Sequence, residues 1–184
     1  MKNKRSFVII LLAFILLLGG AYFAYDKLSS DAPPDNISTN DTPDEYVYAL
    51  DFTVYDADGN KVSLSGFSGK PVVINFWASW CGICKMEMPD FNTAYNEYKD
   101  DVVFMMINVT DGTQETKESA QNYLSDNNFD FPVYYDTDLD AAMKYGANAL
   151  PLTYFINGKG QLLGRGSGLL SLDTLHEAIG TILE

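Results

Sequence analysis

Hydrophobic and polar positions along the chain predict strands separated by helices. Continuous apolar runs at about 71–77 and 101–109 are typical of strands that are buried on both faces. Two further strands are expected at 153–156 and 161–165, because the turn-forming run 157–160 between them predicts a hairpin. These segments favour a sheet whose central strands are covered by other elements.

A half-buried strand is predicted earlier in the chain, where apolar and polar residues alternate from Leu50 to Tyr55. The turn signal 58–60 follows it, and Val62 and Leu64 continue a return strand. This region therefore predicts a short β-hairpin ahead of the central strands.

Apolar residues three or four positions apart predict a helix at about 82–98, with a kink at Pro89. Helical composition marks 113–127, and a short helix is expected at 139–145. A closing helix is predicted from apolar residues on one face: Leu172, Leu175, Ile179 and Ile182. Strands and helices in this order predict a mixed α/β sheet covered on both faces.

Residues 1–25 are predicted to be a membrane anchor. Lys2, Lys4 and Arg5 precede an uncharged run of nineteen residues, 7–25, which as a helix would span roughly 28 Å. The basic flank predicts a cytoplasmic N-terminus and a single-pass protein whose main part lies outside the cytoplasm. A cleaved signal peptide remains the alternative, although its apolar region is usually shorter.

Residues 26–46 are predicted to form a disordered acidic linker, because they are polar, acidic and rich in proline. The globular domain is expected to occupy 47–184. A formal net charge of −13 argues against nucleic acid as a partner, and an apolar fraction of 47 % is ample for a core.

The only two cysteines, Cys81 and Cys84, lie where the strand 71–77 gives way to the helix 82–98. A helix N-terminus favours an anion, and the thiolate is the reactive form of cysteine. Two thiols three residues apart on one helical turn can close into a disulfide and reopen. This C-x-x-C motif therefore predicts a redox couple.

Other readings of the two cysteines are weaker. A structural disulfide stabilises mainly by closing a long loop, and this loop is very short. Zinc usually needs four ligands, whereas the chain offers two cysteines and the distant His176. Two buried, inert cysteines are the third alternative. We expect no metal and no cofactor other than the Cys81–Cys84 disulfide itself.

The run from Phe76 to Pro89, with its W-C-x-x-C and the following E-x-P, resembles the active-site segment of thioredoxin-like proteins. Together with Leu150-Pro151-Leu152-Thr153, it is most similar to the membrane-tethered TlpA/ResA-type thiol–disulfide oxidoreductases of bacteria, over about residues 47–184. The resemblance implies a thioredoxin-like fold. In it, the hairpin is an N-terminal extension, and the helix and strand at 113–135 are a central αβ insertion.

The resemblance also implies roles for individual side chains. Cys81 is expected to be the nucleophile that attacks a client's disulfide, and Cys84 the resolving cysteine. Glu87 lies three residues after Cys84 on the same side of the helix, and we expect it to be the proton acceptor; an ordinary exposed glutamate is the alternative. Thioredoxin's buried aspartate corresponds here to Asn75, which cannot titrate.

Pro151 is expected to be a cis-proline that leaves the backbone of Leu150 free to pair with a client, rather than a proline that merely starts a strand. Trp80, Gly82 and Ile83 are expected to shape the contact surface around Cys81. Trp77 is expected either to join them or to belong to the core. Gly82 and Ile83 are also expected to tune the redox potential, so the direction of electron flow stays open.

The predicted function is extracytoplasmic thiol–disulfide exchange, most simply as a monomeric reductant recharged by a CcdA-like membrane protein. Apocytochrome c and a methionine sulfoxide reductase are the clients that the resemblance suggests. A disulfide-forming oxidase is the alternative within this class. Outside it, a thiol peroxidase would usually carry T-x-x-C, and a non-catalytic binding domain would more often have lost one cysteine.

Overall fold

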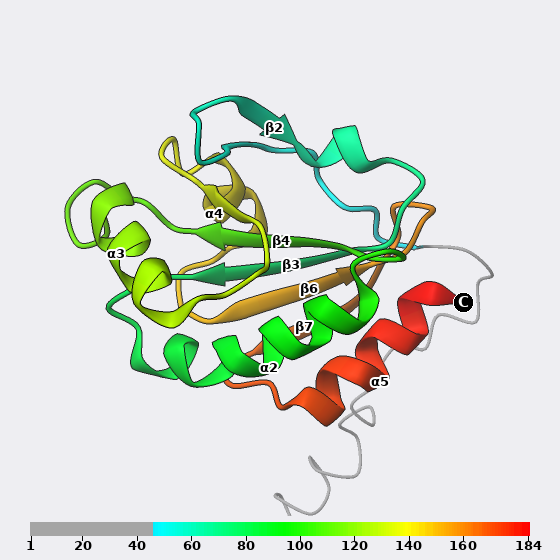
Figure 1. Ribbon diagram of the computed structural model, residues 1–184. Helices are drawn as coiled ribbons and strands as arrows, with labels where there is room; N and C mark the ends of the chain where they lie inside the picture. Colours follow the sequence, from blue (N-terminus) through cyan, green and yellow to red (C-terminus); the bar gives the residue numbers. More distant parts are fainter. Residues whose placement is uncertain (1–45) are drawn as a thin grey trace, which may run out of the picture. The chain divides into compact units, whose positions relative to one another are not determined.

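The computed structural model describes residues 46–184 (Figure 1). The membrane anchor predicted at 1–25 lies outside these residues, and so does the predicted linker 26–46 except for its last residue. Within 46–184, no helix combines the length and the apolar character needed to cross a membrane. The membrane anchor therefore stays a prediction.

The described residues form seven strands of one sheet: β1 (Thr53–Tyr55), β2 (Lys61–Ser63), β3 (Val72–Trp77), β4 (Val103–Asn108), β5 (Val133–Tyr135), β6 (Leu152–Ile156) and β7 (Leu162–Ser167). The strand order across the sheet is β2-β1-β5-β4-β3-β6-β7. Strands β3, β4 and β5 run parallel to one another. On one side, β1 pairs antiparallel with β5 and with β2; on the other, β6 pairs antiparallel with β3 and with β7. The predicted mixed sheet, with its N-terminal hairpin and central insertion, is confirmed.

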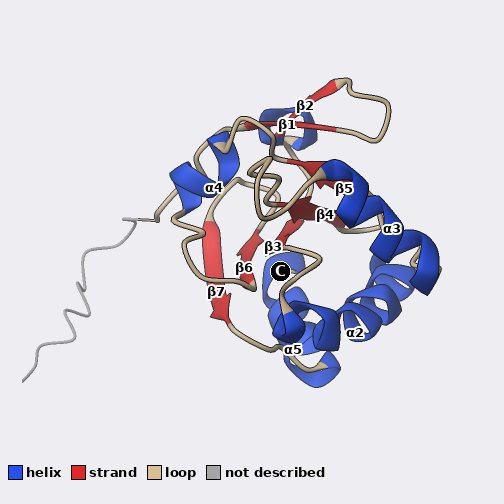
Figure 2. Cartoon of the chain, turned by 90° about the vertical axis from the view of Figure 1, so that its left-hand side faces the viewer, coloured by secondary structure: helices blue, strands red, loops and turns tan. Residues whose placement is uncertain are grey.

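The helices of the described part are α2 (Gly82–Tyr98), α3 (Lys117–Asn127), α4 (Asp140–Tyr145) and α5 (Leu172–Leu183), with a 3₁₀ turn η1 (Leu64–Phe67). Figure 2 shows α2, α3 and α5 on one side of the strands and α4 on the other. The predicted cover on both faces of the sheet is thus confirmed.

Strand β3 is buried along its whole length because its residues alternate between two cores. Val73 and Trp77 pack with α2 and α5, whereas Ile74 and Phe76 pack with β1 and α4. Asn75 is the only polar residue of the strand, and by the same alternation it faces α2. A polar side chain therefore lies beneath the helix that carries the cysteines.

Helix α3 begins at Lys117, which is later than the residue 113 that composition predicts. The carboxylate of Asp111 accepts hydrogen bonds from the main-chain N–H groups of 113–115. Thr116 then caps the helix in a reciprocal pair with Ser119. The prediction was wrong here because these side chains satisfy the local N–H groups in a turn instead of a helix.

The hairpin and helix α2 each differ in one detail from what the sequence predicts or leave it open. The return strand of the hairpin ends at Ser63, and Leu64 begins η1 instead of continuing the strand as predicted. Helix α2 continues through Pro89 to Tyr98, and the kink expected there stays a prediction. Neither point changes where the sheet places the cysteines.

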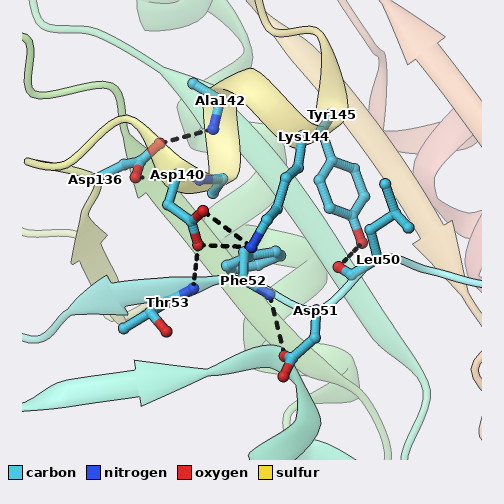
Figure 3. A network of polar contacts seen from close by, with 10 residues as sticks. Leu50, Asp51, Phe52, Thr53, Asp136, Asp140, Ala142, Lys144 and Tyr145 are labelled. Atoms are coloured by element: carbon cyan, nitrogen blue, oxygen red, sulfur yellow. Dashed lines mark hydrogen bonds and ion pairs between the residues drawn. The ribbon is translucent and has the colours of Figure 1, made fainter.

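A polar network joins α4 to the N-terminal extension (Figure 3). The Asp140 carboxylate accepts hydrogen bonds from the N–H of Thr53 at 2.9 Å and from the Lys144 ammonium at 3.0 Å. The Tyr145 hydroxyl donates to the carbonyl oxygen of Leu50 at 2.8 Å. The bonds from Thr53 and to Leu50 join residues that are 87 and 95 positions apart, and they hold the extension against α4.

Candidate active site

Cys81 is the N-cap residue of α2, four residues after the end of β3. Its sulfur accepts a hydrogen bond from the N–H of Cys84 at 3.2 Å. The free N–H groups and the helix dipole favour negative charge at this position. A thiolate on Cys81 is therefore stabilised once the disulfide is opened.

Cys81 and Cys84 are joined by a disulfide, with an S–S distance of 2.10 Å. Cys81 keeps 6 % of its surface exposed, whereas Cys84 has none. Of the two cysteines, only Cys81 therefore keeps any surface that a client could contact. This asymmetry fits an attacking and a resolving cysteine, and those roles stay predictions.

Glu87 is completely buried on the inward face of α2, one turn after Cys84. One carboxylate oxygen accepts a hydrogen bond from the Asn75 amide at 2.8 Å, and the other accepts one from the N–H of Leu170 at 3.0 Å. The alternative of an ordinary exposed helical glutamate is therefore wrong. Its role as proton acceptor for the resolving thiol stays a prediction.

Burial raises the pKa of Glu87 from 4.5 to about 7, although the hydrogen bonds from Leu170 and Asn75 lower it in part. Both protonation states are therefore populated near neutral pH. A group that exchanges protons at the working pH is what general acid–base catalysis requires.

Asn75 suits both states of that carboxyl group. Its Nδ2 donates to Glu87 and, at 3.0 Å, to the hydroxyl of Thr153. Its Oδ1 is buried and has no partner within the described part of the chain. If the amide turns over, this oxygen can accept the proton of a neutral Glu87, which an aspartate at this position could not offer without adding charge.

The peptide bond between Leu150 and Pro151 is cis, as predicted. Strand β6 follows it directly, and Leu152 lies opposite Phe76 in the sheet. Pro151 is therefore placed beside the end of β3, where the segment that leads to Cys81 begins. Its client-binding role remains a prediction.

Exposed apolar side chains surround this end of the sheet. Trp80 and Ile83 are about half exposed, as a contact surface needs, and Gly82 is exposed between them. Met86 and Leu169 are also exposed, although no motif in the sequence marks them as site residues. Trp77, by contrast, is a fully buried core residue.

Glu115 is a buried residue of the site that the sequence pattern does not reveal. Its carboxylate accepts hydrogen bonds from the N–H and hydroxyl of Ser79, at 3.0 and 2.7 Å, and from the amide of Asn108 at 2.7 Å. It lies in a polar segment that would ordinarily be read as an exposed loop. The contacts tie the turn that carries Trp80 and Cys81 to the end of β4.

A Glu115→Gln variant is expected to lose about 1–3 kcal/mol of unfolding free energy, because a neutral amide oxygen replaces the buried carboxylate that accepts charge-assisted hydrogen bonds from Ser79 and Asn108. Exchange through Cys81 is expected to slow as the turn loosens. Urea unfolding and exchange rates check both effects, with the exposed Glu118→Gln as the matched control. Equal behaviour of the two variants would contradict the anchoring role.

No group of three or more His, Cys, Asp or Glu within residues 46–184 is placed to hold a metal ion. His176 lies on α5, where its Nε2 is 2.7 Å from the carboxylate of Glu97 on α2. The structure thus places this histidine in an inter-helix contact away from the cysteines.

Comparison with known proteins agrees with this geometry. The model of the AhpC/TSA family matches residues 47–164. The thiol–disulfide oxidoreductase ResA of Bacillus subtilis is 32 % identical over 187 aligned positions, which cover 99 % of this chain and 96 % of that protein.

Two solved structures share the fold. StoA from Bacillus subtilis superposes with a TM-score of 0.62 and 25 % identity, covering 72 % of this chain and 98 % of the other. The exposed lipoprotein thioredoxin Etrx1 of Streptococcus pneumoniae gives a TM-score of 0.64 and 28 % identity, covering 72 % and 99 %.

Proposed function

Because the chain belongs to the AhpC/TSA family and is a thiol–disulfide oxidoreductase of the ResA type, we propose that it reduces disulfides of client proteins outside the cytoplasm. The observation that carries this proposal is the pairing of an accessible Cys81 at a helix N-terminus with a buried Cys84 and a buried acid.

The proposed reaction starts from the reduced pair. The Cys81 thiolate attacks one sulfur of the client's disulfide, so that a mixed disulfide forms and the client's other sulfur leaves as a thiolate. Cys84 then loses its proton and attacks Cys81. The client's remaining sulfur leaves, the client has gained two electrons, and Cys81–Cys84 is a disulfide again.

Glu87 supplies the base for the second step. Cys84 is buried and resists ionisation, so its proton needs an acceptor within the same dry environment. With a pKa of about 7, Glu87 takes that proton and later returns it. Asn75 remains hydrogen-bonded to the carboxyl group throughout.

The client is proposed to dock along the cis peptide bond and the apolar rim. The backbone of Leu150, just before Pro151, is offered to an extended segment, and Trp80, Gly82 and Ile83 contact the residues that flank the client's cysteine. Apocytochrome c and a methionine sulfoxide reductase are candidate clients of this kind.

The domain is proposed to work as a monomer on a single-pass anchor formed by residues 1–25, with a CcdA-like membrane protein as its electron donor. The basic start and uncharged run of that segment support an extracytoplasmic domain.

The redox potential of the Cys81–Cys84 couple tests the direction of electron flow. We expect a value nearer the about −270 mV of thioredoxin than the about −120 mV of DsbA. Equilibration with glutathione and dithiothreitol buffers, read by thiol alkylation, measures it. A potential at or above the DsbA value would favour the oxidase instead.

A further inference from the structure

The loop between β7 and α5 contacts both auxiliary elements of the active site. The N–H of Gly168 donates to the carbonyl of Pro151 at 3.0 Å. Two residues later, the N–H of Leu170 donates to Glu87 at 3.0 Å. One short stretch of main chain therefore holds the cis-proline turn and the buried carboxyl group together.

The loop can lie this close because β7 carries glycine where the loop packs. A Cβ added at Gly166 would lie 2.9 and 3.0 Å from the two terminal methyl carbons of Leu170. Such distances are shorter than van der Waals contact, so a side chain at 166 would force the end of the Leu170 side chain out of its present packing position. Leu170 itself is almost buried, in the same core cluster as Cys84.

We propose that Gly166 and Leu170 are positioning residues for proton transfer at Glu87, an inference that rests on the proposed function of that carboxyl group. Because Gly166 has no side chain, the Leu170 side chain can pack against β7 at this position. The packed side chain in turn holds the main-chain N–H of Leu170 against Glu87.

The hydrogen bond from the N–H of Leu170 has a large effect on the proton equilibrium of Glu87, because few other donors bond this carboxyl group. Strands β3 and β6 contribute the neutral side chains of Asn75 and Thr153. Its own helix contributes Cys84 and the negative Asp90, which raises the pKa of Glu87. The donors that bond Glu87 in the described residues are all uncharged, so losing one of them shifts its proton equilibrium noticeably.

The test compares exchange rates from pH 5 to 9 for the full-length protein and a Gly166→Ala variant, using a model disulfide peptide. Losing the Leu170 donor raises the pKa of Glu87 further, so the acid limb of the profile is expected to move up by about half a pH unit. The variant is then about threefold slower at pH 6 and equal to the parent at pH 9.

Gly164→Ala is the matched control. It makes the same change on the same strand, but its Cβ would meet Phe155, at 3.3 Å, and not Leu170. We expect this variant to keep the parent's pH midpoint even if it is less stable. Equal midpoints for both variants, shifted or unshifted, would overturn the proposal.

A Leu170→Ala variant keeps the test decisive if Gly166→Ala does not fold. It removes the packed side chain that holds the N–H of residue 170 against Glu87, so the midpoint is expected to move up as in Gly166→Ala; a midpoint at the parent's value would refute the packing argument. An acid limb that survives in Glu87→Gln would instead refute the proposed role of Glu87 itself.

Discussion

A Cys84→Ser variant is expected to stop at the mixed disulfide and to lose turnover by on the order of 10³-fold or more. The physical reason is that Cys81 keeps some exposed surface for a client whereas Cys84 has none. Cys81 is exposed enough to attack and will still bind the client, but no second sulfur is left to release it. Non-reducing electrophoresis with a disulfide-bearing peptide is expected to show a stable adduct that dithiothreitol removes.

Cys81→Ser is the matched control for that experiment. It keeps one thiol, but that thiol is on Cys84, which has no exposed surface in the structure. We expect no adduct and no turnover from this variant. If it forms an adduct as readily as Cys84→Ser does, then the assignment of nucleophile and resolving cysteine is reversed or the reduced site opens.

Local chemistry explains why much of the fold could be predicted from the sequence. The runs at 71–77 and 101–109 indicate buried strands, because parallel strands that are covered on both faces need apolar residues at nearly every position. Gly59, with φ of 85°, makes the hairpin turn signal specific. The C-x-x-C motif and the proline at 151 are likewise recognisable within a few residues.

The parts that could not be predicted depend on contacts between distant residues. Glu115 is polar and sits among polar neighbours, so nothing local indicates that Ser79 and Asn108 bury it. The bond from Leu170 to Glu87 uses a main-chain N–H, and any residue except proline has one. Such a bond leaves no trace in the identity of the donor residue.

The start of α3 shows the same limit at short range. Composition alone favours helix from 113, yet Asp111 and Thr116 satisfy the backbone in a turn and move the start of the helix to Lys117. The segment thereby released is the one that carries Glu115 to the active-site turn. Because the predicted start of α3 was wrong, the sequence did not indicate that Glu115 belongs to the site.

Glu87→Gln has the largest expected effect on the pH dependence of the protein. The folded-state pKa of Glu87 is about 7 and the unfolded reference is 4.5, so between these values the folded protein holds a proton that the unfolded chain releases. The unfolding free energy of the parent therefore falls as pH rises through that window. The loss approaches about 3 kcal/mol above pH 7.

Glutamine carries no titratable proton, so the variant is expected to lack this slope. Its unfolding free energy should be close to that of the parent at pH 4 and higher than that of the parent at pH 8. The turned amide of Asn75 can accept from its NH₂ group while Leu170 still donates to its oxygen. Chemical denaturation at several pH values measures the difference, with the exposed Glu177→Gln as a control that keeps the parent's slope.

Activity is expected to move in the opposite direction. Without the carboxylate, the proton of Cys84 has no acceptor in its buried environment, so resolution of the mixed disulfide slows by on the order of 10²-fold at pH 7. A variant that is more stable at pH 8 yet slower to release its client would show that burying Glu87 lowers the stability of the protein but provides the proton acceptor that Cys84 needs. If the variant gains no stability and loses no rate, then Glu87 is a structural residue and the resolving thiol must use another acceptor.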